Sequence, residues 1–326
     1  MKRRLLIQTC ASLAATALLP LVAQVAHAAP YPEKPVKIIV SLPPGSGADT
    51  TARFLAQQLS QQLGQSFIVE NKPGANSFIA AKAVAEAAPD GYTMFVASNT
   101  PMVTNAAVFK QLPYDPVKDF TPVASFARFP MALAVPPNSP YKTLPDLVAA
   151  LKAAPGKLNF ASGTPSYQIA MEQFHDMNGV KGTAVNFKGT GPAITDLVSG
   201  VCDYSIAEIS SILALVQGGR LRALGVADAQ RLRDLPDVPT AAEQGYKGFE
   251  ASAWTGVFFP AKVPKEIVQR VGDLVRNIVS GPDGTAFIHK TGGTQFIGSA
   301  QQFAEFQISE IDKTKRIVKL AHIPVE

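Results

Sequence analysis

The sequence predicts an α/β protein with two domains. Segments rich in β-branched residues alternate with amphipathic segments along the chain, which is typical of largely parallel sheets covered by helices. The 326 residues exceed what one hydrophobic core usually supports, and 47% of them are hydrophobic. Residues 123–135 and 249–259 are the candidate crossovers between the two domains.

The N-terminal residues 1–28 have the three parts of a secretory signal. Residues 2–4 are basic, an Ala-rich apolar stretch follows, and residues 26–28 read Ala-His-Ala, a small-x-small cleavage pattern. The alternative is a membrane anchor, but Gln8 and Pro20 interrupt the stretch and a spanning helix needs about 20 apolar residues. We therefore expect an exported protein of the periplasm.

Composition excludes several classes of function. The formal net charge of +5 includes the three basic residues of the signal, and no stripe of Lys and Arg follows, so we expect no nucleic-acid partner. Beyond the signal Cys202 is the single cysteine, so no intramolecular disulfide is expected. His175, His289 and His322 lack the spacing of metal ligands, and we expect no metal and no cofactor.

The first strand, loop and helix form the most informative unit. Residues 36–40 read as a strand, residues 41–49 as a glycine-containing loop, and residues 50–63 as a helix that ends at Gly64. The amides of a first helical turn lack partners, and the helix dipole favours negative charge there. This unit therefore predicts an anion site.

Within that loop, Ser46, Gly47 and Ala48 are the candidate amide donors. The alternative is an ordinary turn, in which glycine supplies a positive φ and Asp49 caps the helix.

The first half of the chain continues the alternation. Strands are expected at 67–70 and 92–97, where β-branched and aromatic residues gather. Between them we expect a helix at 77–88 capped by Ser77, and the turn at 90–91 separates this helix from the second strand.

The second half repeats this pattern. Pro192 opens and Gly200 closes one of its helices, as the terminal preferences of these residues predict. The expected helices lie at 144–154, 166–177, 192–200, 265–279 and 300–320, and the expected strands at 157–161, 183–187, 202–206 and 221–227. Ligands in open α/β sheets bind beyond the carboxyl ends of strands. If the domains face each other, one cleft is lined by the loops at 43–49, 71–78, 98–100, 162–166, 188–191 and 207–210.

Short motifs follow one another in a fixed order along the chain. They include Leu-Pro-Pro-Gly at 42–45, Asp49 with Ala-Arg at 52–53, Val-Glu-Asn-Lys-Pro-Gly-Ala at 69–75, Pro-Asp-Gly-Tyr-Thr at 89–93, Leu-Pro-Tyr-Asp-Pro at 112–116, Gly-Arg-Leu-Arg-Ala-Leu at 219–224 and Leu-Pro-Asp-Val-Pro-Thr at 235–240. Together they resemble the Bug (TctC-like) family of periplasmic solute receptors of tripartite tricarboxylate transporters.

The resemblance implies a two-lobed, periplasmic-binding-protein-like fold of type II, with two Rossmann-like domains around a ligand cleft. It implies one domain from 29–128 and 252–326 and a second from 129–251. The implied function is capture of a small carboxylate and its delivery to membrane transporter subunits, by a monomer that is not an enzyme.

In that family two loops grip one carboxylate, largely through backbone amides. The residues that the resemblance and the loop positions mark as ligand-binding are Leu42, Pro44, Gly45, Ser46, Gly47, Ala48, Asp49, Phe78, Ser98, Asn99, Ser162, Gly163, Thr164, Ser166, Phe187, Lys188 and Glu208.

The chain departs from the family pattern at positions that select the ligand. Phe187 replaces a usual Tyr, Phe78 stands where a small or polar residue is common, and Ala207-Glu208 stands where Asp-Asn is common. Phe78, Phe187 and Tyr167 as pocket walls favour an aromatic carboxylate, whereas core packing is the alternative. A dicarboxylate ligand remains an open alternative.

Two charged residues have two interpretations each. Glu208 could accept a hydrogen bond from a ligand hydroxyl, amide or ammonium, or pair with Lys188 or Arg220. Arg53 could form a structural ion pair or clamp the ligand directly.

Other functions fit the sequence less well. Gly45-x-Gly47 with Glu70 suggests a dinucleotide-dependent oxidoreductase, but Thr50 stands where a third glycine belongs. A hydrolase would need a nucleophile motif, and no Gly-x-Ser-x-Gly occurs. A receptor that signals to a sensor protein is not separated from a transport receptor.

Overall fold

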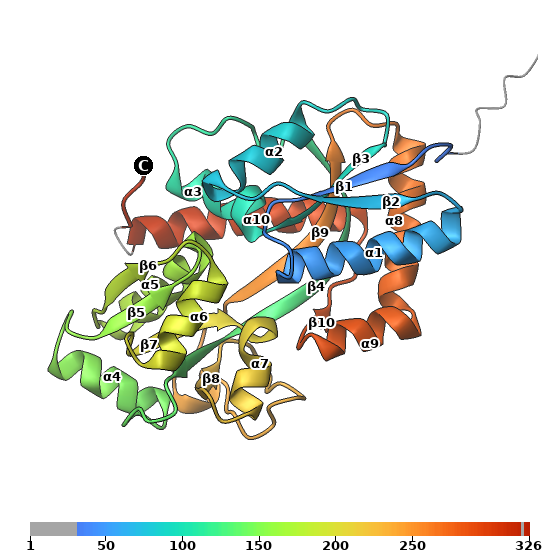
Figure 1. Ribbon diagram of the computed structural model, residues 1–326. Coiled ribbons are helices and arrows are strands. Elements are labelled where there is room, and N and C mark those ends of the chain that lie inside the picture. The colour runs from blue at the N-terminus through green and yellow to red at the C-terminus, as the bar shows by residue number, and fades with distance from the viewer. Residues whose placement is uncertain (1–30, 321–322) are drawn as a thin grey trace, which may run out of the picture. The chain divides into compact units, whose positions relative to one another are not determined.

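The computed structural model describes residues 31–320 and 323–326. The expected signal at 1–28 therefore lies outside the described residues. Residues Lys34–Glu326 form one compact unit, and the unit before it ends at Glu33. Within the larger unit, two sheets share one long strand and define two lobes (Figure 1).

The sheet of lobe 1 has the order β2-β1-β3-β9-β4. β1 pairs in parallel with β2 and β3, whereas β9 pairs antiparallel with β3 and β4. Its strands are β1 (Val36–Val40), β2 (Phe67–Asn71), β3 (Thr93–Ser98), β4 (Phe120–Val135) and β9 (Ser252–Pro260), and the short β10 (Thr294–Gln295) pairs with β4. Because β1 and β3 run in parallel, their following loops emerge at one edge of the sheet.

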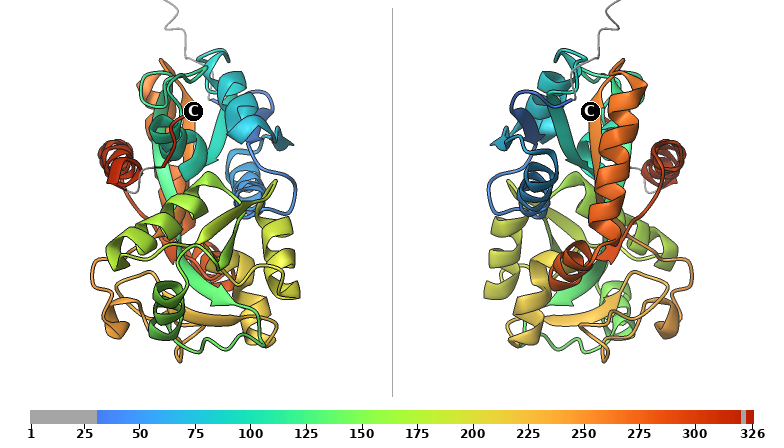
Figure 2. Two further views of the ribbon diagram at one scale, coloured as in Figure 1. Left: turned by 90° about the vertical axis from the view of Figure 1, so that its left-hand side faces the viewer. Right: turned by 90° about the vertical axis from the view of Figure 1, so that its right-hand side faces the viewer.

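Helices cover both faces of this sheet (Figure 2). Phe54 of α1 and Phe287 of α9 pack on Phe126 of β4. α2 and α10 share a core cluster with Phe95 and Trp254. The helices of lobe 1 are α1 (Gly47–Leu63), α2 (Phe78–Ala85), α3 (Asn105–Val108), α8 (Lys265–Ser280), α9 (Pro282–Lys290) and α10 (Ala300–Leu320), with short helical turns η1 (Ala75–Ser77) and η2 (Thr100–Thr104).

The sheet of lobe 2 has the order β8-β4-β7-β5-β6. Its strands are the end of β4 together with β5 (Asn159–Ser162), β6 (Thr183–Asn186), β7 (Tyr204–Glu208) and β8 (Arg222–Val226). Its helices are α4 (Leu144–Ala153), α5 (Pro165–Asn178), α6 (Thr190–Ser199) and α7 (Ile209–Gln217), with a short turn η3 (Ala242–Gln244). β5, β6 and β7 are parallel, so α5, α6 and α7 all begin at the carboxyl edge of this sheet.

The chain passes between the lobes inside β4 and just before β9. β4 pairs with β9 up to Pro130, and from Met131 onward it pairs with β7 and β8. The chain returns at Ala251, which bonds to lobe 2, and Ser252 begins β9. The two lobes are joined covalently at these two connections.

The α/β class and the two-lobed architecture predicted from the sequence are confirmed, with local differences. α1 begins at Gly47 rather than Thr50 because Ser46, not Asp49, is the N-cap. Ser77 makes no capping hydrogen bond, since its backbone is left-handed (φ 72°). The short helices α3, α7 and α9 were not predicted. Within the described residues, no helix is long and apolar enough to cross a bilayer.

Candidate functional site

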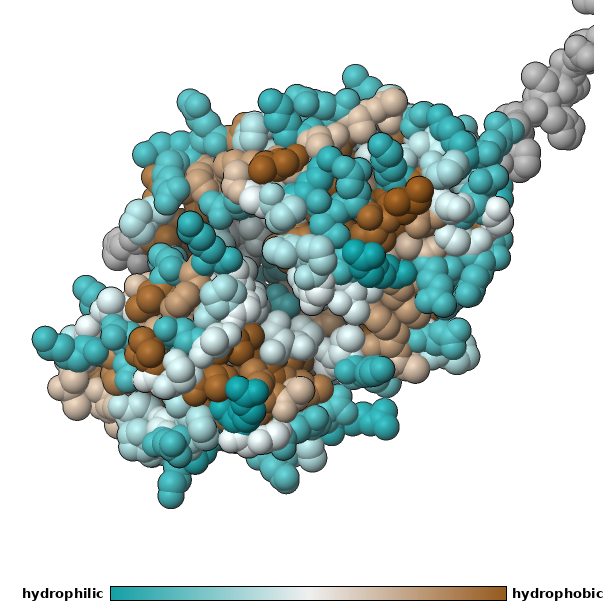
Figure 3. Space-filling view, viewed as in Figure 1, coloured by the Kyte–Doolittle hydropathy of each residue, from teal (hydrophilic) through white to brown (hydrophobic). Residues whose placement is uncertain are grey.

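Two adjoining cavities lie between the lobes, at the carboxyl edges of both sheets. The inner cavity has a volume of about 80 Å³ and the outer one about 590 Å³. Both are lined by Leu42, Ser46, Gly47, Phe129, Thr164, Thr190 and Ser211. The space-filling view shows the surface hollowed between the two lobes (Figure 3). Lining residues from both lobes make this a candidate ligand cleft.

The loop before α1 brings two unpartnered amides to the cleft. Ser46 N donates to Pro43 O at 3.2 Å, whereas no partner within the described chain is recorded for the amides of Gly47 and Ala48. Both residues line the inner cavity. Of the three amide donors predicted from the sequence, the structure therefore leaves two available, and both belong to the positive end of a 17-residue helix.

Asp49 holds this loop in place and lines neither cavity. Its buried carboxylate accepts from Gly45 N at 2.9 Å, Arg53 Nε at 3.0 Å and Asn71 Nδ2 at 2.9 Å. Burial raises the pKa of Asp49, but the hydrogen bonds from Arg53, Gly45 and Asn71 outweigh it, so the pKa lies below its ordinary value. Arg53 lines neither cavity, which supports its interpretation as a structural ion-pair partner.

The loop between β5 and α5 contributes the facing wall. The Thr164 side chain caps α5 by accepting from Tyr167 N at 3.3 Å, and Thr164 and Ser166 line the inner cavity. Ser166 Oγ lies 2.9 Å from Thr104 Oγ1 and 3.5 Å from Thr100 Oγ1 of lobe 1. These hydroxyl contacts join the lobes directly beside the cavity.

Gly163 lets this loop pack against the loop before α6. A Cβ at Gly163 would lie 2.7 Å from Thr190 Cα and 2.9 Å from Gly189 O, both backbone atoms. Thr190 itself lines both cavities. The position of one cleft wall therefore depends on the absence of a side chain.

Replacing Gly163 with alanine is expected to lower the free energy of unfolding by about 1–3 kcal/mol, the usual cost of overpacking. Urea unfolding of the two proteins measures this difference. Gly191→Ala is the matched control, because a Cβ there meets nothing within 4 Å. Equal stability of Gly163→Ala and the wild type would contradict the proposed packing.

Glu208 is the N-cap residue of α7 and lines the inner cavity. Ser210 Oγ donates to Glu208 Oε2 at 3.4 Å, and Glu208 N donates to Tyr167 Oη at 3.5 Å. Burial raises the pKa of the Glu208 carboxyl, and hydrogen bonds from Tyr167 and Ser210 lower it by less. The ion pairs recorded among the described residues do not include Glu208, so neither Lys188 nor Arg220 is its partner.

The two strands that connect the lobes form the floor of the inner cavity. Phe129 of β4 and Ala253, Trp254 and Thr255 of β9 line it. Trp254 Nε1 and Thr255 Oγ1 are buried without a hydrogen-bond partner in the described chain. Buried polar atoms usually have a partner, so these two are candidate contacts for a ligand.

Most of the residues predicted from the sequence lie around the cleft. Those at the inner cavity are Leu42, Ser46, Gly47, Ala48, Ser98, Asn99, Thr164, Ser166 and Glu208, and those that line only the outer one are Pro44, Gly45 and Lys188. Asp49, Phe78, Ser162, Gly163 and Phe187 line neither. Asn99 also bridges β3 and β9, because its side chain accepts from Trp254 N at 2.7 Å and donates to Ser252 O at 3.1 Å.

The placement of two phenylalanines corrects the interpretation of an aromatic wall. Phe78 is partly buried and packs edge-on against Phe109 and Tyr114 at the core of lobe 1. Phe187 packs against a small cluster of lobe 2 that includes Cys202. The aromatic side chains at the inner cavity are instead Phe129 and Trp254.

Five residues of the inner cavity lie outside every loop predicted to line the cleft, namely Phe129, Ser211, Ala253, Trp254 and Thr255. Thr100 and Thr190 lie within the predicted loops at 98–100 and 188–191, although neither was named as a ligand-binding residue. No sequence signal shows that the crossover strands lie under the cleft.

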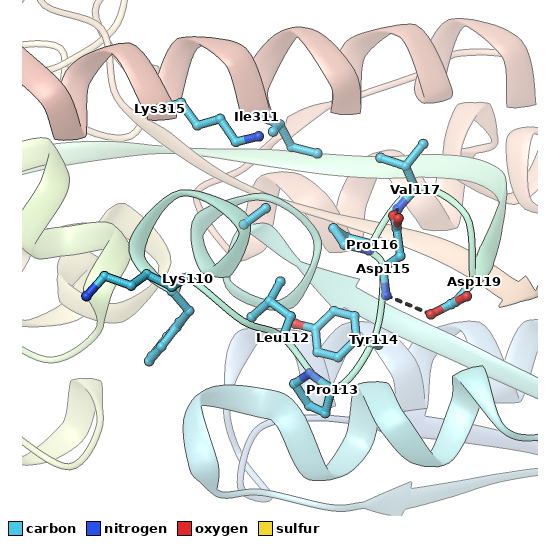
Figure 4. A pocket seen from close by; sticks show the side chains of 12 residues that line it. Lys110, Leu112, Pro113, Tyr114, Asp115, Pro116, Val117, Asp119, Ile311 and Lys315 are labelled. Carbon is cyan, nitrogen blue, oxygen red and sulfur yellow. Dashed lines mark hydrogen bonds between the residues drawn. The ribbon is translucent and has the colours of Figure 1, made fainter. Parts of the chain in front are cut away.

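A further hollow of about 580 Å³ lies between the 109–119 loop and α10 (Figure 4). Its loop satisfies its own polar groups, since Asp119 accepts from Asp115 N and Asp115 accepts from Val117 N and Lys118 N. Tyr114 Oη donates to Pro101 O. We therefore assign the candidate site to the cleft. No group of three or more His, Cys, Asp or Glu side chains among the described residues could hold a metal ion.

Comparison with known proteins identifies the family of this chain. Residues 51–323 match the family TctC, described as the tripartite tricarboxylate transporter family receptor. The protein BugT of Bordetella pertussis is 32% identical over 292 residues, which cover 89% of this chain and 90% of BugT.

Two solved structures have the same fold. An R. palustris protein with adipate superposes with a TM-score of 0.86 at 32% identity and covers 90% of this chain and 99% of its own. MatC from Rhodopseudomonas palustris with bound malate gives a TM-score of 0.81 at 31% identity, covering 88% of this chain and all of MatC (100%).

Proposed function

This chain belongs to the TctC family of tripartite tricarboxylate transporter receptors, and on that basis we propose that it captures a small carboxylate in the cleft between its lobes. The observation that carries the proposal is the pair of unpartnered amides, Gly47 N and Ala48 N, beside an enclosed cavity. Each charge-assisted hydrogen bond contributes roughly 1.5–3 kcal/mol. A few of them suffice for micromolar affinity, about −8 kcal/mol.

The proposal extends to location, partners and domains. The protein acts in the periplasm as a monomer without catalysis, and it delivers its ligand to the membrane subunits of a tripartite transporter. One domain comprises 29–128 with 252–326 and the other 129–251, a division supported by the change of β4 partners after Pro130. The ligand-binding residues are those at the two cavities.

A carboxylate screen tests this function. The mature protein, unfolded and refolded to remove co-purified ligand, is tested by thermal shift and calorimetry with mono- and dicarboxylates, aliphatic and aromatic. At least one is expected to raise Tm by roughly 5–10 °C at saturating concentration. The matching uncharged amides serve as controls. Stabilisation by none of the carboxylates would count decisively against the proposal.

A further inference from the structure

Glu208 places a carboxylate in the cavity proposed for an anionic ligand. Among the described residues that line the inner cavity, it is the one ionisable side chain. Its recorded side-chain partners are the hydroxyls of Ser210 and Tyr167, and neither carries a charge. A second carboxylate beside it would be costly unless Glu208 is protonated or a positive charge lies between the two groups.

The carboxylate lies next to the turn that offers the free amides. A Cβ on Gly47 would be 3.9 Å from Glu208 Oε2. A ligand carboxylate held by Gly47 N and Ala48 N would therefore have Glu208 as a close neighbour. A positive charge that separates the ligand carboxylate from Glu208 must be on the ligand itself. It must lie close to the ligand carboxylate and not at the far end of a long ligand.

We propose that Glu208 determines ligand specificity by binding a protonated amine on the carbon adjacent to the ligand carboxylate. The carboxylate of such an α-amino acid lies at the amides of α1, and its ammonium lies between that carboxylate and Glu208. The zwitterion brings no net charge into the cleft, whereas a dicarboxylate adds two negative charges beside Glu208. The inference rests on the proposed function and names the ligand class of the same site.

Three series of ligands that differ only at C2 test this inference. They are alanine, lactate and propionate; aspartate, malate and succinate; and phenylalanine, phenyllactate and phenylpropionate. Calorimetry with the refolded mature protein measures their affinities. In at least one series the amine is expected to bind tenfold or more tightly than its hydroxyl and unsubstituted counterparts, roughly the size of a close charge pair.

Glu208→Gln keeps the size of the side chain and removes its charge. It is expected to reduce the preference for the amine by roughly tenfold or more. Affinity for the unsubstituted ligand is expected to stay or rise, which also shows that the cleft is intact. Glu86→Gln, at an exposed carboxylate paired with Lys82 outside the cleft, is the matched control and is expected to change nothing.

Two results would overturn the inference while the proposed function stands. One is a wild-type preference for the hydroxyl or unsubstituted ligand in every series that binds. The other is an unchanged preference in Glu208→Gln. If neither these ligands nor the wider set of carboxylates bind, the inference and the proposed function both fail.

Discussion

Asp49→Ala is expected to lower the free energy of unfolding by about 3 kcal/mol. This value is the lower end of the range for a broken buried ion pair, and it applies because the Arg53 side chain is half-exposed. The variant leaves Gly45 N, Arg53 Nε and Asn71 Nδ2 without their shared acceptor. The loop that positions Gly47 and Ala48 then loses its anchor, so ligand affinity is expected to fall as well. Urea unfolding and calorimetry measure the two effects.

Asp146 offers a matched control for this prediction. It occupies the third position of α4 and accepts from Lys142 N at 2.9 Å and Thr143 N at 3.0 Å, but it is exposed and lies outside the cleft. Asp146→Ala is expected to destabilise less than Asp49→Ala and to leave ligand affinity unchanged. Equal losses of unfolding free energy in the two variants would show that the burial and the loop contacts of Asp49 add nothing to stability.

The same network predicts a pH dependence. The pKa of Asp49 is lower in the folded protein than in the unfolded chain, so its contribution to stability is complete above the unfolded pKa of about 3.9. That contribution is lost as the pH falls through the folded pKa. The stability difference between wild type and Asp49→Ala is therefore expected to shrink below about pH 4.

Gly47→Pro is expected to weaken ligand binding by roughly 10- to 100-fold, the contribution of one charge-assisted hydrogen bond. Gly47 is the first residue of α1, where proline is compatible with a helix and its missing N–H breaks no internal hydrogen bond. Ser46 already has the extended backbone (ψ 162°) that a residue before proline requires. Calorimetry with the carboxylate found in the screen measures the change.

Gly47→Ala distinguishes the loss of the amide N–H from the effect of an added side chain. It keeps the N–H, and its Cβ meets Glu208 Oε2 at an ordinary contact distance of 3.9 Å. We expect affinity near that of the wild type for Gly47→Ala. Wild-type affinity in Gly47→Pro, with cooperative unfolding preserved, would show that this amide does not bind the ligand.

Much of the fold follows from local patterns. The strand predicted at 36–40 is β1, and the helix predicted at 300–320 is α10. Two of the three helices that were not predicted, α7 and α9, have weak local signals. α7 begins directly after β7 without a side-chain cap, and α9 opens with Pro282-Asp283-Gly284, which reads as a turn.

The sequence by itself determined the α/β class, the succession of strands and helices, and a glycine-containing loop before α1, since these depend on residues close together in the chain. Only the tertiary structure decided which amides stay free, that Phe78 packs against the core of lobe 1, and that Phe129 and Trp254 form the floor of the cleft. The physical reason is that a periodic pattern shows which side chains are buried, whereas the partners of those side chains come from other segments of the chain, as Phe129 of β4 and Trp254 of β9 show. Gly47 and Glu208 become neighbours solely because the two lobes face each other.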